Sequence, residues 1–391
     1  MKTISSNKLP KLMCLAAILL LSTQSAFAYP PDNAAVLYYR ACLFYQSDKA
    51  MMSKVTDLLK GRIEVDEDIK KYVATNGHTI DSALTAADVK NCDWGVDYSK
   101  GFSTVLPHYV PLRDIAKLIL ADAKILAAQG DYETALSHCV SIHKMARHVS
   151  DGIIISYLVG IAFEDLANNC IQNILADMPQ DSEALTCFKN ELVDIETRTP
   201  SMKAAVSKDF KAWSADARIE KKDELLRFLN DECLSFPEYA SERLKNADEE
   251  FFERNRDYSQ NFVNQQIAAF DLAYEQAYTR LKELSEIPSK DAAKNPDATL
   301  TVALVPAVGK LYGQGIKVQT FSNAIRAAVD IYIIMAKTGR LPDELPAGLP
   351  KDLFSSEDFE YEKIDDGFIL RCQGKDLLKD EIHEYEFKIK K

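Results

Sequence analysis

Apolar residues recur with helical spacing through the middle of the chain, from Leu112 to Pro179. The first apolar face consists of Ile115, Ala116, Leu118, Ile119, Ala123, Leu126 and Ala127. Gly130-Asp131 interrupts the pattern, a second face follows from Tyr132 to Val149, and a third apolar run covers Ile153 to Met178. Spacings of three and four residues are typical of amphipathic helices, so this region predicts three consecutive helices.

Helical patterns also lie on either side of this region. Asn33 to Tyr45 and Met51 to Gly61 each predict a short helix, whereas the stretch from Gly77 to Pro111 is less regular. Between Ser259 and Ser285, apolar residues alternate by fours and threes. This predicts one long helix with a coiled-coil seam of about three heptads. Such a seam would pack antiparallel on another helix of the chain or, as the alternative, join two copies in a dimer.

The C-terminal residues change to a pattern of period two. An apolar helix from Phe321 to Lys337 is expected to end at Thr338-Gly339, because glycine commonly terminates helices. FEYEKI, the turn Asp365-Asp366-Gly367 and FILRC then predict a β-hairpin, and EYEFKIK predicts a third strand. The predicted fold class is therefore mainly α, with a multi-helix body, repeat-like helical hairpins and a small C-terminal antiparallel β-element.

The N-terminus has the pattern of a secretory signal peptide over residues 1–28. Three lysines precede an apolar core, and small residues lead to a cleavage point between Ala28 and Tyr29. Later apolar runs are shorter than a membrane span, so none is predicted in the mature chain. We expect the mature protein in the periplasm, secreted or at the cell surface.

Charge narrows the range of partners. The 391-residue chain has 47 basic and 59 acidic side chains, a formal net charge of −12. Removal of the leader, which contains three lysines and no acidic residue, leaves 44 basic against 59 acidic side chains, a charge of −15. This excess of acidic groups argues against nucleic-acid partners, because phosphates attract basic surfaces.

Seven cysteines follow the leader, and an odd number in an exported protein implies at least one unpaired thiol. Cys170 and Cys187 lie on either side of the turn-like sequence MPQDS, so a disulfide between them across a helical hairpin is one hypothesis. No CxxC pair occurs, so the sequence does not predict a zinc ribbon.

The segment NCDWGVDYSKG, residues 91–101, contains one of the two tryptophans and admits two interpretations. In the first, Asp93, Trp94, Tyr98 and His108 line a ligand pocket with a carboxylate and an imidazole available for acid–base chemistry. In the second, which we favour, Trp94 and Phe102 cover the end of the helical stack and Asp93 bonds the local backbone.

Other polar patterns give no catalytic or metal site. His138, His143 and His148 are five residues apart, a step of about 500° on a helix, so they cannot share one metal ion. Glu164, Asn168 and Gln172 recur every fourth residue and predict a solvated stripe in preference to a catalytic glutamate. The motifs HExxH, GxSxG, GxGxxG and the Walker sequence are absent, so no cofactor is predicted.

The sequence also resembles three known groups of proteins. GDYETAL and its flanks resemble a single tetratricopeptide repeat, and the GRLPDELP tail with its hairpin resembles the C-terminal part of type II secretion pseudopilins. The mature chain as a whole, through CDWG, GDYETAL and the GRLPDEL tail, is similar to a group of exported helical proteins of planctomycetes and related bacteria. The last resemblance implies architecture and export but no chemistry.

Together these patterns predict three parts after the leader: a helical body with a tetratricopeptide-like hairpin (29–200), long charged helices with the coiled-coil-like seam (201–340), and the β-tail (341–391). The expected function is that of a non-enzymatic scaffold or protein-binding protein of the cell envelope, with other envelope proteins as partners. One alternative is a hydrolase or carbohydrate-acting enzyme that uses the Asp93/His108 region. The other is a subunit of an envelope secretion or pilus-like machine. The sequence leaves the oligomeric state open.

Overall fold

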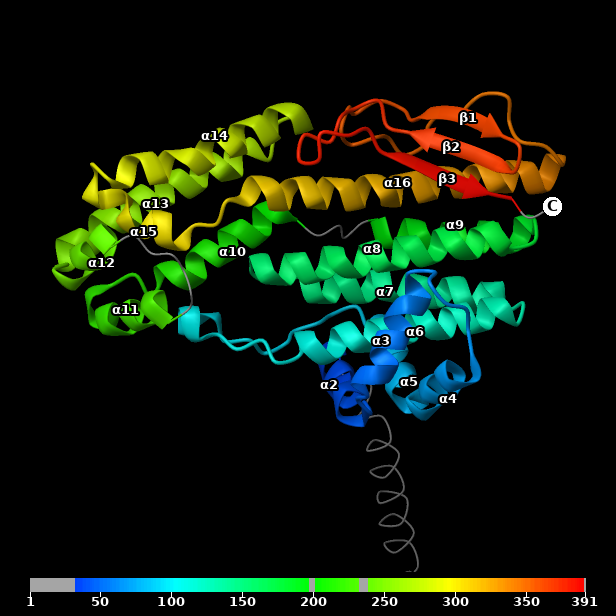
Figure 1. Ribbon diagram of the computed structural model, residues 1–391, viewed down its shortest axis with the longest axis horizontal. Helices are drawn as coiled ribbons and strands as arrows, with labels where there is room; N and C mark the ends of the chain where they lie inside the picture. Colours follow the sequence, from blue (N-terminus) through cyan, green and yellow to red (C-terminus); the bar gives the residue numbers. More distant parts are fainter. Residues whose placement is uncertain (1–31, 197–200, 232–237, 390–391) are drawn as a thin grey trace, which may run out of the picture.

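The computed structural model describes residues 32–196, 201–231 and 238–389, and over these residues the protein is mainly helical with one small sheet (Figure 1). The predicted fold class is therefore confirmed. The predicted leader and its cleavage point at Ala28 and Tyr29 lie outside the described residues.

Four short helices form the N-terminal part. Three of them are capped at the N-terminus by the side chain of the residue that precedes the helix. The four helices are α2 (Ala34–Phe44), α3 (Lys49–Leu59), α4 (Glu67–Thr75) and α5 (Gly77–Ala87). The Asn33, Asp48 and Asp66 side chains each accept a hydrogen bond from a backbone N–H in the first turn that follows. The expectation of irregular structure from Gly77 was wrong for α5. This helix buries mainly alanines and small polar residues, whose periodicity is weak in the sequence.

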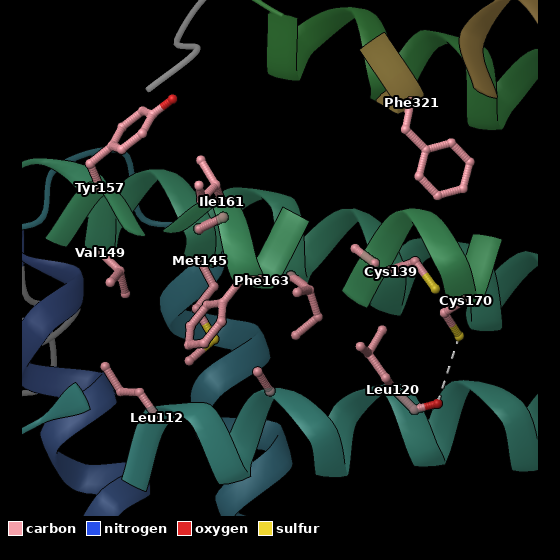
Figure 2. Close-up of a cluster of buried hydrophobic side chains, with 14 of the residues drawn as sticks. Leu112, Leu120, Cys139, Met145, Val149, Tyr157, Ile161, Phe163, Cys170 and Phe321 are labelled. Carbon is pink, nitrogen blue, oxygen red and sulfur yellow. Dashed lines mark hydrogen bonds between the residues drawn. The ribbon is translucent and has the colours of Figure 1, made fainter. Parts of the chain in front are cut away.

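The three consecutive helices predicted for the middle of the chain are present. They are α6 (Tyr109–Ala128), α7 (Tyr132–Ser150) and α8 (Ile154–Asp177). Gly130 has a φ of +90°, which permits the turn between α6 and α7, and the Asp131 carboxylate accepts a hydrogen bond from Thr134 N. Figure 2 shows the core between these helices, where Leu112 of α6, Met145 of α7 and Phe163 of α8 face one another.

Helix α8 is the centre of the body. It packs against α6 and α7 on one side and against α16 (Val308–Thr338) on the other. Among the described residues it is the one helix long and apolar enough to cross a membrane, and 61% of its apolar window is buried in the fold. Burial against protein on several sides is typical of a core helix.

The remaining helices continue along the molecule from α9. They are α9 (Ser182–Glu196), α10 (Met202–Ser214), α11 (Lys222–Asp231), α12 (Glu238–Lys245), α13 (Glu249–Ala269), α14 (Tyr274–Ala292) and α15 (Thr299–Leu304). Short 3-10 turns lie at Tyr98–Ser103, Ile219–Lys221 and Pro296–Ala298. Helices α10 to α15 gather at one end of the body (Figure 1).

The single long helix expected from Ser259 to Ser285 was wrong, because the chain turns between α13 and α14. Val263 of α13 and Tyr274, Leu281 and Leu284 of α14 are nonetheless buried, as the seam predicts. The two helices contact each other within the chain. The seam is therefore shared by two helices of a hairpin.

The β-tail covers one face of α16. Strands β1 (Glu360–Ile364), β2 (Gly367–Arg371) and β3 (Glu384–Lys388) form an antiparallel sheet in that order. Phe368 and Leu370 of the central strand lie opposite Phe387 and Tyr385 of β3. The sheet packs on α16, where the ring centroids of Phe321 and Tyr385 are 4.9 Å apart. The predicted helix stop is confirmed, since Gly339 caps α16 with a φ of +73°.

Candidate functional site

The segment 91–101 covers one end of the helical stack. Trp94 is 9% exposed, and its indole stacks on the His108 imidazole with centroids 4.3 Å apart and planes 8° from parallel. Its N–H donates a hydrogen bond to the backbone oxygen of His148 at 2.8 Å, near the end of α7. The ring of Tyr38 in α2 also stacks with the indole, with centroids 5.4 Å apart. Trp94 thus packs between Tyr38, His108 and the end of α7; the Phe102 side chain lies outside the described part.

Asp93 holds the local backbone. Its carboxylate is exposed and accepts a hydrogen bond from Gly95 N at 2.9 Å, while the Asn33 side chain bonds both the Asp93 N–H and its carbonyl oxygen. Gly95 has a φ of +64°, a conformation that suits glycine at this turn. Asp93 therefore acts as a turn residue that ties the segment to the start of α2.

His108 lies behind Trp94 and is 1% exposed. Among the described residues, neither of its ring nitrogens has a hydrogen-bond partner, so Asp93 does not orient or charge it. Burial lowers the pKa of His108 to about 4, so the imidazole is neutral at physiological pH. Tyr98 is half-buried, and its hydroxyl lies near Ser156, which also accepts a hydrogen bond from Tyr109. Trp94 and His108 are thus part of a packed aromatic cluster. Asp93 and His108 do not form an acid–base pair.

A wide, open pocket borders this plug, with a volume of about 700 Å³. Charged groups of both signs line it, including Lys90, Asp93, Arg147, Asp151 and Lys208. Lys208 and Asp151, which both line the pocket, form an ion pair with each other.

A second cavity, the deep cavity, has a volume of about 240 Å³ and is formed by α7, α8, α9 and α16 with one residue of the tail. The lining residues are His143, Arg147, Glu164, Asn168, Leu192, Gln319, Ser322, Asn323, Ile325, Arg326 and Leu353. Eight of these eleven side chains are polar or charged, which is unusual for a cavity inside a helical core.

Glu164 is the central acidic group of this cavity. It is 4% exposed, and burial raises its pKa to about 7, although the charges of Arg147 and Arg326 act in the opposite direction. Asn168 is 1% exposed and donates a hydrogen bond to Ser322 Oγ of α16 at 2.9 Å. The expectation of a solvated stripe at Glu164 and Asn168 was therefore wrong, because α16 covers this face of α8.

The three histidines of α7 point into three different environments, as their spacing predicts. His138 faces Asp122 of α6 at 3.6 Å, and His148 bonds the Tyr38 hydroxyl at 3.0 Å. His143 lines the deep cavity, where burial lowers its pKa to about 3 and the nearby Asn168 side chain opposes that change. The cavity that contains Glu164 is therefore also lined by a neutral imidazole.

One group of side chains with metal-ligating atoms lies within mutual reach in the described part of the chain: Asp376, Glu381 and His383. Asp376 is fully buried, and its Oδ1 accepts a hydrogen bond from Leu378 N at 2.8 Å. Its Oδ2 lies 2.9 Å from His383 Nε2. Both carboxylate oxygens thus have partners within the protein, and the group acts as the hydrogen-bonded centre of the tail loop.

In the structure Cys170 and Cys187, considered above as one hypothesis for a disulfide, are both free thiols. Cys187 is exposed on α9, whereas Cys170 faces the core between α8 and α6 (Figure 2). The Cys170 thiol lies against Cys139 of α7 and 3.9 Å from the backbone oxygen of Leu120. The two residues flank the predicted turn, but one side chain is in the core and the other is at the surface.

The fold and these sites define a class: a helical body with a β-tail, an aromatic plug and one buried polar cavity. A comparison of the chain with protein-family models, curated proteins and solved structures finds no match. Function is therefore inferred from the geometry of the surface and the cavities.

Proposed function

We propose that the protein is a non-enzymatic scaffold or binding protein of the cell envelope, and that it holds a partner protein against helix α2. The signal-peptide pattern of residues 1–28 supports placement in the envelope. The exposed apolar face of α2 supports the binding role, and this observation carries the proposal.

Large apolar side chains of α2 face solvent on one side of the helix. Val36 is 40% exposed and Leu43 is 87% exposed, whereas Tyr39 between them is 37% exposed and its hydroxyl donates a hydrogen bond to the backbone oxygen of Trp94 at 3.1 Å. Spacings of three and four residues place these side chains on one face. An exposed apolar surface of this kind commonly marks a protein–protein contact.

A groove of about 420 Å³ runs beside this face, between α2 and α5. Leu37, Arg40 and Phe44 line it from α2, with His78 and Asp81 among the residues from α5. The Arg40 guanidinium lies 5.5 Å from the centre of the Phe44 ring. Five of the seven side chains that line the groove are polar or charged, so an amphipathic helix would place polar residues here and its apolar residues on Val36 and Leu43. We therefore assign the partner as an envelope protein with an amphipathic helical segment that carries a carboxylate for Arg40.

Neither alternative has comparable support. The hydrolase hypothesis needs Asp93 and His108 to act together, yet Asp93 bonds the backbone and His108 is buried behind Trp94. The secretion-machine hypothesis needs an exposed apolar face on the seam or on the β-element, and in the β-element Phe368, Leu370 and Phe387 are buried. The seam side chains at Val263, Leu281 and Leu284 are buried within the chain.

The test is affinity capture from the native envelope with the wild-type protein and two matched variants. Leu43→Lys places a charge in the α2 face, and Ile382→Lys does the same at a tail residue that is 50% exposed. We expect the wild type and Ile382→Lys to capture the same partner and Leu43→Lys to lose it. Equal capture by both variants would contradict the proposal.

A further inference from the structure

The deep polar cavity plays no part in the proposed partner contact. It lies among α7, α8, α9 and α16, whereas α2 is on the far side of α6 and α7 in Figure 1. Its polar lining therefore needs a separate explanation.

Three buried polar side chains line this cavity: His143, Glu164 and Asn168. His143 is 5% exposed, and its Nε2 has no hydrogen-bond partner among the described residues. Glu164 is 4% exposed, and burial shifts its pKa more than any neighbouring group does. Buried polar groups in native proteins are nearly always satisfied, so a buried carboxyl group that lines a polar cavity points to a ligand that bonds it.

The charges of the cavity indicate what that ligand carries. Arg147 and Arg326 lie on different helices and act electrostatically on Glu164. A guanidinium has five N–H donors, so each arginine can keep its contacts within the protein and still bind a carboxylate. The Glu164 carboxyl group offers acceptors to an amino or hydroxyl group. The cavity therefore contains both cationic hydrogen-bond donors and hydrogen-bond acceptors.

We propose that this cavity binds a small carboxylic acid that also carries an amino or hydroxyl group, such as an amino acid or a hydroxy acid. The arginines bind the carboxylate, and Glu164 accepts hydrogen bonds from the second group. The cavity of about 240 Å³ limits the size of the ligand. Since a cavity of about 150 Å³ holds benzene, this one holds a molecule of roughly ten non-hydrogen atoms.

The experiment is a calorimetric titration of the purified full protein. The probes are glycine, serine, aspartate, lactate and malate, with acetate, propionate, ethylamine and glycerol as compounds that lack one of the two groups. We expect at least one two-group compound to bind roughly tenfold or more tightly than every single-group compound. Comparison of the amino acids with the hydroxy acids then shows whether an amino or a hydroxyl group is preferred. If no two-group compound binds better than acetate, the proposal is wrong.

Variants test whether the binding occurs in this cavity. Glu164→Gln keeps the shape of the side chain and should weaken the two-group compounds roughly tenfold while leaving acetate unchanged. Arg326→Gln should weaken all carboxylates, with circular dichroism as the check of folding. Asp165→Asn, at the next position of α8 and outside the cavity lining, should bind as the wild type does. Unchanged binding by Glu164→Gln would overturn the assignment even if Arg326→Gln failed to fold.

Discussion

The buried carboxyl group of Glu164 makes the stability of the protein depend on pH in a way that one substitution can reveal. Glu164→Gln replaces this group with an amide of the same shape that carries no charge. The pKa of Glu164 rises from its ordinary value of 4.5 to about 7 because burial disfavours the charged form. The folded protein therefore holds this proton more tightly than the unfolded chain does.

The sign and size of the effect follow from this difference. The stabilising contribution of protonated Glu164 is fully present below pH 4.5 and is lost as pH rises through about 7. Each pH unit between the two values corresponds to about 1.4 kcal/mol. Charging Glu164 in the folded state therefore lowers the free energy of unfolding by about 3 kcal/mol.

Urea unfolding of the wild type and of Glu164→Gln at about pH 5 and about pH 8 measures this effect. Other buried groups also titrate: the pKa of Asp209 is raised to about 6 and that of His143 is lowered to about 3, both by burial. These groups are present in both proteins, so the stability difference between the proteins isolates Glu164. Part of the loss has already occurred at about pH 5, so we expect this difference to change by about 2.5 kcal/mol in favour of the variant at the higher pH.

Glu183→Gln is the matched control, because Glu183 is exposed in the first turn of α9. Its stability difference from the wild type should stay nearly constant over the same pH range. If the Glu164→Gln difference were equally constant, the Glu164 carboxyl group would be solvated in the folded protein, and the reasoning from its burial would be wrong.

Three further predictions concern the plug, the tail and the thiols. Trp94→Ala should lower the free energy of unfolding by about 3 to 5 kcal/mol in urea titrations, because loss of the buried indole leaves a cavity. Asp352→Asn should cost about 3 kcal/mol in the same assay, because the buried Asp352 carboxylate accepts hydrogen bonds from both Gln373 N and Gly374 N. In the native protein a thiol reagent should modify Cys187 quickly, whereas the buried Cys139 and Cys170 should react only after denaturation.

Each of these predictions has a result that would contradict it. Losses below about 1 kcal/mol for Trp94→Ala would show that the indole is not packed as a plug. A similarly small loss for Asp352→Asn would show that the tail loop does not depend on this carboxylate. Equal reactivity of all thiols in the native protein would contradict the positions of Cys139 and Cys170 in the core.

The elements that could be predicted from the sequence are those with strong local signals. Gly339 ends α16, and the turn Asp365-Asp366-Gly367 joins β1 to β2, because both positions use local backbone chemistry. The break between α13 and α14 has no such signal. Tyr274 after the turn continues the spacing of apolar residues before it, so the pattern of one helix and that of two helices look alike.

The deep cavity could not be predicted because its walls come from distant parts of the chain. Along α8, Glu164 and Asn168 have the composition of a solvated face. Their burial depends on α16, where Ser322 accepts the hydrogen bond from Asn168 across 154 positions of sequence. A single sequence contains no local signal for such a contact. Trp94 differs in this respect, because a lone tryptophan in a glycine-containing loop before a long apolar helix already indicates a local cover.

The binding role of α2 is tested most directly by site-specific photo-crosslinking in the intact envelope. A photoreactive side chain replaces Leu43 in one variant and Ile382 in the other, since both positions are exposed. We predict one discrete adduct with a different envelope protein from position 43 and none of that mass from position 382. An adduct from position 43 with a second copy of this chain, no adduct there, or the same adducts from both positions would contradict the binding role.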